Sequence, residues 1–113
     1  MTSPVTMTLA ALAAQSCRAG APLLTTAELA PRLSVLAGWA HEDGKLRKTF
    51  RLPDYYRTIA FVKAIAWMAN RQDHHPDLSV HYGHVVVDWS THDAGGVTLN
   101  DCICAARTEQ LAP

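Results

Sequence analysis

Residues 73–92 read DHHPDLSVHYGHVVVDWSTH, and this stretch decides the fold. Pro76 disfavours the helical region for the residue before it, so the preceding helix must end at or before the two histidines. Ser79 to Tyr82 and His84 to Thr91 then surround Gly83, and the longer segment alternates between apolar and polar residues, as a strand with one buried face does. The stretch predicts a helix end, a loop carrying two histidines and a β-hairpin.

A second hairpin and a long helix are predicted before this stretch. Trp39 to Glu42 and Lys45 to Leu52 flank Asp43-Gly44, a dipeptide suited to the left-handed dihedrals of a two-residue turn. Asp54 to Asp73 places apolar side chains at helical spacing around much of the circumference. The chain thus continues from the first hairpin into a helix with an extensive apolar surface.

Two shorter helices complete the predicted order. Thr25 and Glu28 have the spacing of a capping box, and leucines recur behind them at one-face spacing up to Gly38. Thr98 and Asp101 have the same capping spacing at the start of a last apolar helix. The order helix-strand-strand-helix-strand-strand-helix predicts an α+β domain, with a four-stranded antiparallel sheet and three helices packed on one face.

Length and composition fit one folded domain. The chain has 113 residues, of which 49% are hydrophobic, enough for one core and too few for two. Residues 1–23 are rich in Ala and Thr, lack acidic residues and end in Gly20-Ala21-Pro22. We therefore expect residues 1–23 to form a flexible N-terminal extension and residues 24–113 to form the domain.

The charge balance and hydropathy exclude two classes of protein. Ten Lys plus Arg balance ten Asp plus Glu, whereas a protein that binds nucleic acid gains affinity from an excess of clustered positive charge. The apolar run from Ile59 to Ala69 is shorter than a bilayer span of about 20 residues and contains Lys63. We expect neither nucleic acid nor membrane as a direct partner.

The cysteines and the N-terminus indicate a cytoplasmic setting. Three cysteines leave an odd thiol, and Cys102 and Cys104 lie two apart in a predicted helix, where they point in different directions and cannot pair. Met7 to Cys17 imitates a short signal sequence, but no Lys or Arg precedes it. Both features favour a reducing compartment.

Histidines are the best candidates for chemistry. His74 and His75 are adjacent, and His92 follows the last predicted strand. Imidazole titrates near pH ~6.5, so a pair supplies an acid and a base at neutral pH, although a single loop histidine is more often a solvated surface residue. His81 and His84 form a weak zinc pattern without a nearby cysteine pair, so we expect no metal. The expected reaction class is proton transfer.

Asp101 has two competing interpretations. Its spacing from Thr98 is that of a helix-capping carboxylate, which is the simpler explanation. The same carboxylate can instead orient a ligand or a histidine. Spacing alone leaves both interpretations open.

Three segments carry a resemblance to a known family. Residues 73–80, 85–92 and 96–101 together closely resemble the pterin-4a-carbinolamine dehydratases, and the similarity extends over roughly residues 24–111. The resemblance implies a hydro-lyase, 4a-hydroxytetrahydrobiopterin dehydratase, that converts this 4a-hydroxytetrahydropterin to quinonoid dihydropterin and water, with no bound cofactor. It also implies a role in recycling the pterin cofactor of aromatic amino acid hydroxylases.

The resemblance assigns roles to individual residues. The family's three active-site histidines fall on His74, His75 and His92. The substrate-binding positions that it implies are Asp73, Pro76, Thr91, Asp93 and Asp101.

The resemblance also implies partners and leaves an alternative. It predicts a homodimer or homotetramer with a functional link to an aromatic amino acid hydroxylase. Some relatives use the same fold as a non-catalytic binding module, a dimerisation or assembly cofactor for another protein. The chain departs from many members at Asn70, where an acidic residue is frequent, at Leu78, where an aromatic is frequent, and at Asn100, where many carry a basic or polar residue.

Overall fold

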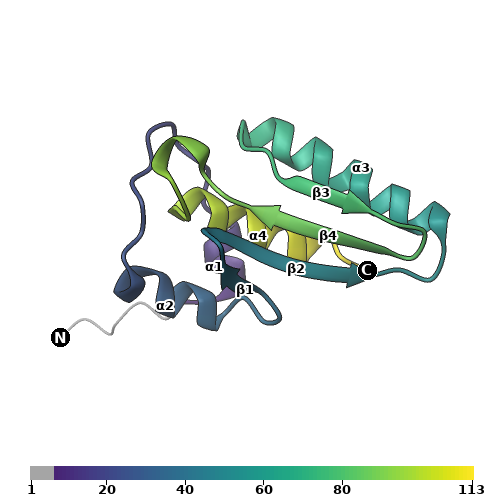
Figure 1. Ribbon diagram of the computed structural model, residues 1–113, viewed down its shortest axis with the longest axis horizontal. Coiled ribbons are helices and arrows are strands. Elements are labelled where there is room, and N and C mark those ends of the chain that lie inside the picture. The colour runs from purple at the N-terminus through teal and green to yellow at the C-terminus, as the bar shows by residue number, and fades with distance from the viewer. Residues whose placement is uncertain (1–6) are drawn as a thin grey trace.

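The computed structural model describes residues 7–113 (Figure 1). Its elements are α1 (Leu9–Ala13), α2 (Thr26–Ser34), β1 (Ala40–Glu42), β2 (Lys45–Arg51), α3 (Tyr55–Gln72), β3 (Asp77–Val80), β4 (His84–Trp89), the 3-10 turn η1 (His92–Ala94) and α4 (Leu99–Leu111). The four strands form one sheet in the order β1-β2-β4-β3, and every neighbouring pair is antiparallel. The predicted α+β fold with a four-stranded antiparallel sheet is confirmed.

Both predicted hairpins are present. Asp43 and Gly44 join β1 to β2 with φ of 51° and 72°, the left-handed values that a two-residue turn of this kind requires. In the second hairpin β3 begins at Asp77, two residues earlier than predicted, because pairing with β4 starts directly after Pro76. Residues 81–83 form the turn, where His81 N–H donates to the carbonyl of His84 at 2.9 Å.

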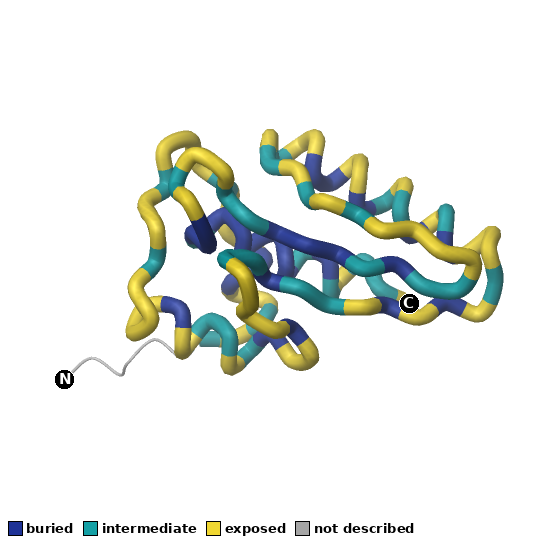
Figure 2. The backbone as a smooth tube through the Cα atoms, in the orientation of Figure 1, coloured by how far each residue is buried: buried dark blue, intermediate teal, exposed yellow. Residues whose placement is uncertain are grey.

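The core lies between one face of the sheet and the helices. Val85, Val87 and Trp89 of β4 have no exposed surface, and the indole Nε1 of Trp89 donates to Thr108 Oγ1 of α4 at 3.2 Å. Figure 2 shows this stretch of β4 as buried, and Figure 1 shows α4 behind it. The same cluster of buried residues includes members of the three predicted helices: Leu29 of α2, Ile65 of α3 and Ile103 of α4. These helices therefore share one core with the sheet.

Helix α3 has a capped start and one buried side. The Asp54 side chain accepts from the backbone N–H of Arg57 at 2.8 Å, which satisfies one donor of the first turn. Phe61 and Ile65 are buried, whereas Trp67 is 66% exposed. No helix within residues 7–113 is long and apolar enough to cross a membrane.

The N-terminal segment packs differently from the expected flexible extension. In α1, Leu12 is fully buried and Ala13 is 4% exposed, and both join the main core. Residues 102–106 of α4 are all buried, so α4 is apolar both on the side that faces the sheet and on the side that faces away from it. Helix α1 covers the side that faces away from the sheet. Part of the predicted extension thus packs against the domain, while its residues 1–6 lie outside the described residues.

Replacing Leu12 with Ala tests this packing. We expect the free energy of unfolding to fall by about 2–4 kcal/mol, because the change removes a fully buried side chain and leaves a cavity. Urea unfolding of wild type and variant measures the difference. The matched control is Leu23→Ala, where the leucine is 53% exposed and the loss should stay below about 1 kcal/mol. Equal, small losses at both positions would mean that α1 does not belong to the core.

Candidate active site

The end of α3 delivers His74 to the site. Asp73 closes the helix in the left-handed conformation, with φ of 49°, which is uncommon for a residue other than glycine and turns the chain away from the helix axis. The His74 N–H then donates to the carbonyl of Ala69 at 3.2 Å. The helix therefore ends before the two histidines, as Pro76 predicts.

A buried ion pair holds the His74 ring. Its Nε2 lies 2.6 Å from Oδ1 of Asp101, and the two side chains are 12% and 0% exposed. The ring also stacks on the indole of Trp89, with centroids 5.6 Å apart and planes 18° from parallel. Since a carboxylate only accepts, Nε2 carries the proton of this bond and Nδ1 is the nitrogen left for other partners.

Asp101 both caps the helix and orients the histidine. Its Oδ2 accepts from the backbone N–H of Thr98 at 2.8 Å, at the start of α4. The same oxygen accepts from Thr91 Oγ1 at 2.8 Å, and this leaves Thr91 Oγ1 to accept from Thr98 Oγ1, also at 2.8 Å. Because Oδ1 serves His74 at the same time, the two interpretations of Asp101 left open by its spacing are both correct.

The hydrogen bond to Asp101 raises the pKa of His74 above its usual value. Partial burial of the ring acts in the opposite direction, and the charges of Asp101, Cys17 and Asp73 add to the rise. A larger fraction of His74 is therefore protonated at neutral pH than of an ordinary histidine, which suits a group that donates a proton.

The three predicted histidines line one shallow hollow of about 240 Å³. Six of the eight predicted site residues border it: Asp73, His74, His75, Thr91, His92 and Asp93. Asp101 lies behind His74, to which it is bonded. Pro76 is the exception, because it lines a separate hollow with Trp67, Leu78 and His75.

Thr91 contributes mainly through its side chain. Its backbone N–H donates to the carbonyl of Gly96 at 2.9 Å, and its carbonyl accepts from Gly95 N–H at 3.1 Å. Both backbone groups of Thr91 are thus engaged within the loop. The hydroxyl, bonded to Asp101, helps to fix the carboxylate that holds His74.

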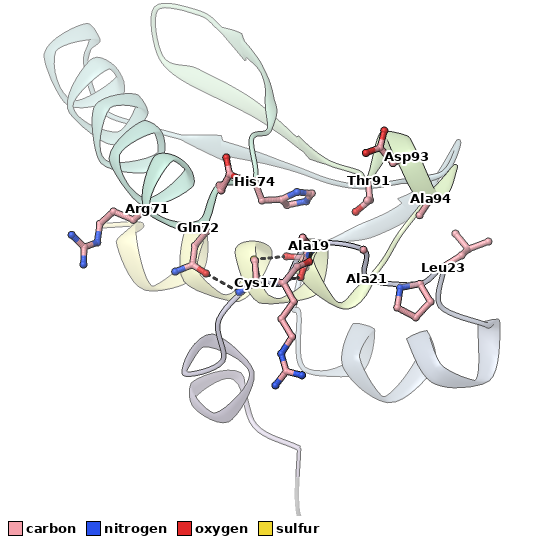
Figure 3. A pocket seen from close by; sticks show the side chains of 15 residues that line it. Cys17, Ala19, Ala21, Leu23, Arg71, Gln72, His74, Thr91, Asp93 and Ala94 are labelled. Carbon is pink, nitrogen blue, oxygen red and sulfur yellow. Dashed lines mark hydrogen bonds between the residues drawn. The ribbon is translucent and has the colours of Figure 1, made fainter.

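A larger cavity of about 740 Å³ adjoins the histidine hollow (Figure 3). The two share Asp73, His74, Thr91 and Asp93. The opposite wall consists of residues 17–23, together with Gln72 and Asn100. The sequence did not predict this wall, because only the fold brings it beside His74; the local signals were the similarity of Cys17 to Leu24 to a leader segment found in many bacterial family members and the departure at Asn100.

The remaining histidine pair does not form a metal site with other residues. The His81 and His84 rings stack with centroids 4.1 Å apart, and Nε2 of His81 lies 2.8 Å from Ser79 Oγ. Within residues 7–113, no group of three or more His, Cys, Asp or Glu side chains is arranged to hold a metal ion.

Comparison with known proteins places this site in a family. Residues 22–111 match the family model described as pterin 4 alpha carbinolamine dehydratase. The chain belongs to the pterin-4a-carbinolamine dehydratase family. Two relatives are each named "Putative pterin-4-alpha-carbinolamine dehydratase". The one from Chromobacterium violaceum is 61% identical over 79 residues, covering 70% of this chain and 73% of the relative. The one from Xanthomonas axonopodis pv. citri is 58% identical over 90 residues, covering 78% and 76%.

Two solved structures share the pterin dehydratase fold. A transcriptional coactivator/pterin dehydratase from Brucella melitensis superposes with a TM-score of 0.76 and 30% identity, over 80% of this chain and 98% of that one. A pterin dehydratase-like RuBisCO assembly factor of the alpha-carboxysome superposes with a TM-score of 0.57 and 23% identity, over 67% and 94%. The second likeness concerns the fold alone.

The Asp101→Asn variant tests the cause of the His74 pKa. The amide cannot carry the charge that stabilises the imidazolium, so we expect the pKa of His74 to fall toward the usual value of about 6.5. NMR titration of the ring proton resonances measures it. Asp93→Asn is the control, because Asp93 is not among the groups that shift His74. An unchanged pKa in Asp101→Asn would contradict the pairing.

The same pair makes stability depend on pH. The pKa of His74 is higher in the folded chain than in the unfolded chain, so protonation of the ring stabilises the fold. This stabilisation is complete below the unfolded-state pKa of about 6.5 and is lost as the pH rises through the raised pKa of the folded chain. Unfolding wild type and Asp101→Asn between pH 5 and pH 9, about the range over which a histidine titrates, should give a difference that shrinks with rising pH. The part of the difference due to the weaker hydrogen bonds of an uncharged amide should remain at every pH.

Proposed function

We propose that this chain is a 4a-hydroxytetrahydropterin dehydratase, a hydro-lyase that uses histidines as general acid and base. The observation that carries the proposal is the convergence of His74, His75 and His92 on one hollow, with His74 held by the buried carboxylate of Asp101. Membership of the pterin-4a-carbinolamine dehydratase family supplies the substrate class. The named relatives support the same activity.

The proposed reaction needs one proton donor and one acceptor. The lone pair of N5 forms a double bond to C4a as the C4a–O bond breaks, and protonated His74 donates a proton to the departing hydroxyl, which leaves as water. His75 or His92 then takes the proton from N5, giving the quinonoid dihydropterin. Exchange of protons with solvent restores both histidines. Such proton transfers contribute about 10²–10⁴-fold to a rate.

The other predicted site residues take supporting roles in this proposal. Asp73 and Asp93 border the hollow and are placed to contact the pterin ring. Asp101 and Thr91 act as positioning residues, because their side chains hold His74. Pro76 ends the helical conformation before His75 and shapes the loop.

The wider setting follows from the substrate. Aromatic amino acid hydroxylases release 4a-hydroxytetrahydropterins, so such a hydroxylase is the expected functional partner. We expect the cytoplasm as the compartment, since Cys17, Cys102 and Cys104 are free thiols. We also expect a homodimer or homotetramer, for which exposed Tyr56 and Trp67 on α3 offer apolar surface. Sedimentation equilibrium tests the assembly, and a monomer mass at micromolar concentration would contradict it.

A binding module of the same fold is the alternative. The RuBisCO assembly factor that shares the fold illustrates that the fold serves other purposes. The arrangement around His74 favours the enzyme, because a buried carboxylate that raises a histidine pKa has a clear use in proton transfer.

A coupled assay tests the proposal. Freshly generated 4a-hydroxytetrahydropterin is followed spectroscopically with and without the protein, and wild type should accelerate its dehydration. His74→Ala and His75→Ala should each lower turnover by about 10²-fold or more, with melting temperatures that stay high enough for both to be folded. His84→Ala is the matched control, because this ring stacks on His81 outside the hollow. Equal activity of wild type and the His74→Ala, His75→Ala double variant would remove the catalytic role.

A further inference from the structure

Two thiols lie next to each other beside the larger cavity. Cys17 is the first of residues 17–23, which we call the wall segment, and its Sγ lies 3.5 Å from Sγ of Cys104 in α4. We propose that Cys17 and Cys104 are a redox-active pair: hydrogen peroxide oxidises Cys17, and Cys104 then closes a disulfide that fastens the wall segment to α4. This inference goes beyond the proposed dehydratase function and does not depend on it.

The fold brings the two sulfurs together although they are 87 positions apart in the sequence. Gln72 Oε1 accepts from the Cys17 N–H at 2.9 Å. The Asn100 side chain accepts from the N–H of Arg18 at 3.0 Å and donates to the carbonyl of Arg18 at 2.7 Å. These bonds fix the backbone at Cys17. A disulfide bond of about 2.0 Å therefore needs only an approach of about 1.5 Å, which rotation of the side chains supplies.

Cys17 is the thiol that an oxidant reaches first. It is partly exposed and lines the cavity of about 740 Å³ (Figure 3). The hydrogen bond with Cys104 lowers the pKa of Cys17, and the positive charges of His74 and Arg107 lower it further, against the opposite effects of burial and Asp101. Because the thiolate is the form that reacts with peroxide, Cys17 is the attacking sulfur.

The other two cysteines keep their protons. Cys104 has no exposed surface, and its hydrogen bond with Cys17 together with burial raises its pKa. Burial raises the pKa of Cys102 to about 12. Among the three cysteines of the chain, Cys17 alone combines partial exposure with a lowered pKa. Cys104, in contact with Cys17, is then placed to resolve the oxidised sulfur.

The proposed oxidation has two steps. The Cys17 thiolate attacks one oxygen of hydrogen peroxide, the O–O bond breaks, and the products are a sulfenic acid and hydroxide, which takes a proton from solvent to form water. The Cys104 sulfur then attacks the Cys17 sulfur. As the S–O bond breaks, the hydroxyl group leaves with the Cys104 proton as a second water. The two thiols lose two electrons and the peroxide gains them. A reversible disulfide of this kind is compatible with a reducing compartment.

Peptide mapping after oxidation tests the pairing. The protein is treated with hydrogen peroxide at a dose that oxidises a free cysteine standard, the remaining thiols are alkylated, and the protein is digested without reduction. We expect a peptide pair joined through Cys17 and Cys104 in wild type, which separates after treatment with dithiothreitol. Cys17→Ala should give no disulfide. Cys102→Ala is the matched control, because it removes a buried thiol of the same helix, and it should still form the joined pair.

The Cys104→Ala variant tests the order of the two steps. Without the resolving thiol, the sulfenic acid on Cys17 should persist and be captured by dimedone. Should this buried substitution prevent folding, Cys17→Ala at the partly exposed position still tests the pair. Three results in wild type would overturn the inference: both thiols remain free, Cys17 is oxidised without a disulfide, or the disulfide joins Cys102 or a second molecule.

Hydrogen exchange tests whether the disulfide fastens the wall segment. The backbone N–H groups of Cys17 and Arg18 are bonded to side chains of α3 and α4, and they exchange when these contacts open. Oxidation should slow both by about tenfold or more, because the cross-link opposes opening. The His81 N–H, in the turn between β3 and β4 at the opposite end of the sheet (Figure 1), is the control and should exchange equally in both forms. Unchanged exchange at Cys17 and Arg18 would overturn the proposed fastening.

Discussion

A carboxylate without exposed surface organises this molecule. Removing a charge from water is costly unless hydrogen bonds replace its hydration, and Asp101 obtains them from the start of α4, from the loop after β4 and from the loop after α3. The partners on these segments lie 3, 10 and 27 positions from Asp101, and all three segments must come together for the carboxylate to be satisfied. The site around Asp101 therefore forms only when these segments of the chain fold together.

The sequence predicted those features that local chemistry controls. Asp43 and Gly44 adopt the left-handed turn that an Asp-Gly dipeptide favours, and Pro76 ends the helix before the histidines. The capping spacing of Thr98 and Asp101 located the start of α4 and the carboxylate that matters most. Each of these signals spans a few residues and depends little on the rest of the chain.

The features that the sequence did not predict depend on contacts across the chain. Asn100 binds the backbone of Arg18, 82 positions away, and no sequence pattern near either residue predicts this contact. Residues 7–23 lack charge patterning and look loosely attached, yet Leu12 is fully buried against a helix that is apolar on more than one side. Asp101 was ambiguous for the same reason, since its spacing shows the cap and only the fold shows the histidine.

The left-handed conformation of Asp73 strains the backbone but places a negative charge beside His74. Glycine would adopt this φ without penalty, whereas a side chain there costs on the order of 1 kcal/mol. The carboxylate that glycine would lack lies beside His74 and favours its protonated form. A substitution chosen only to relax the chain at this corner would thus yield a more stable protein in which a smaller fraction of His74 is protonated at neutral pH, so thermal stability is a poor guide to improving this enzyme candidate.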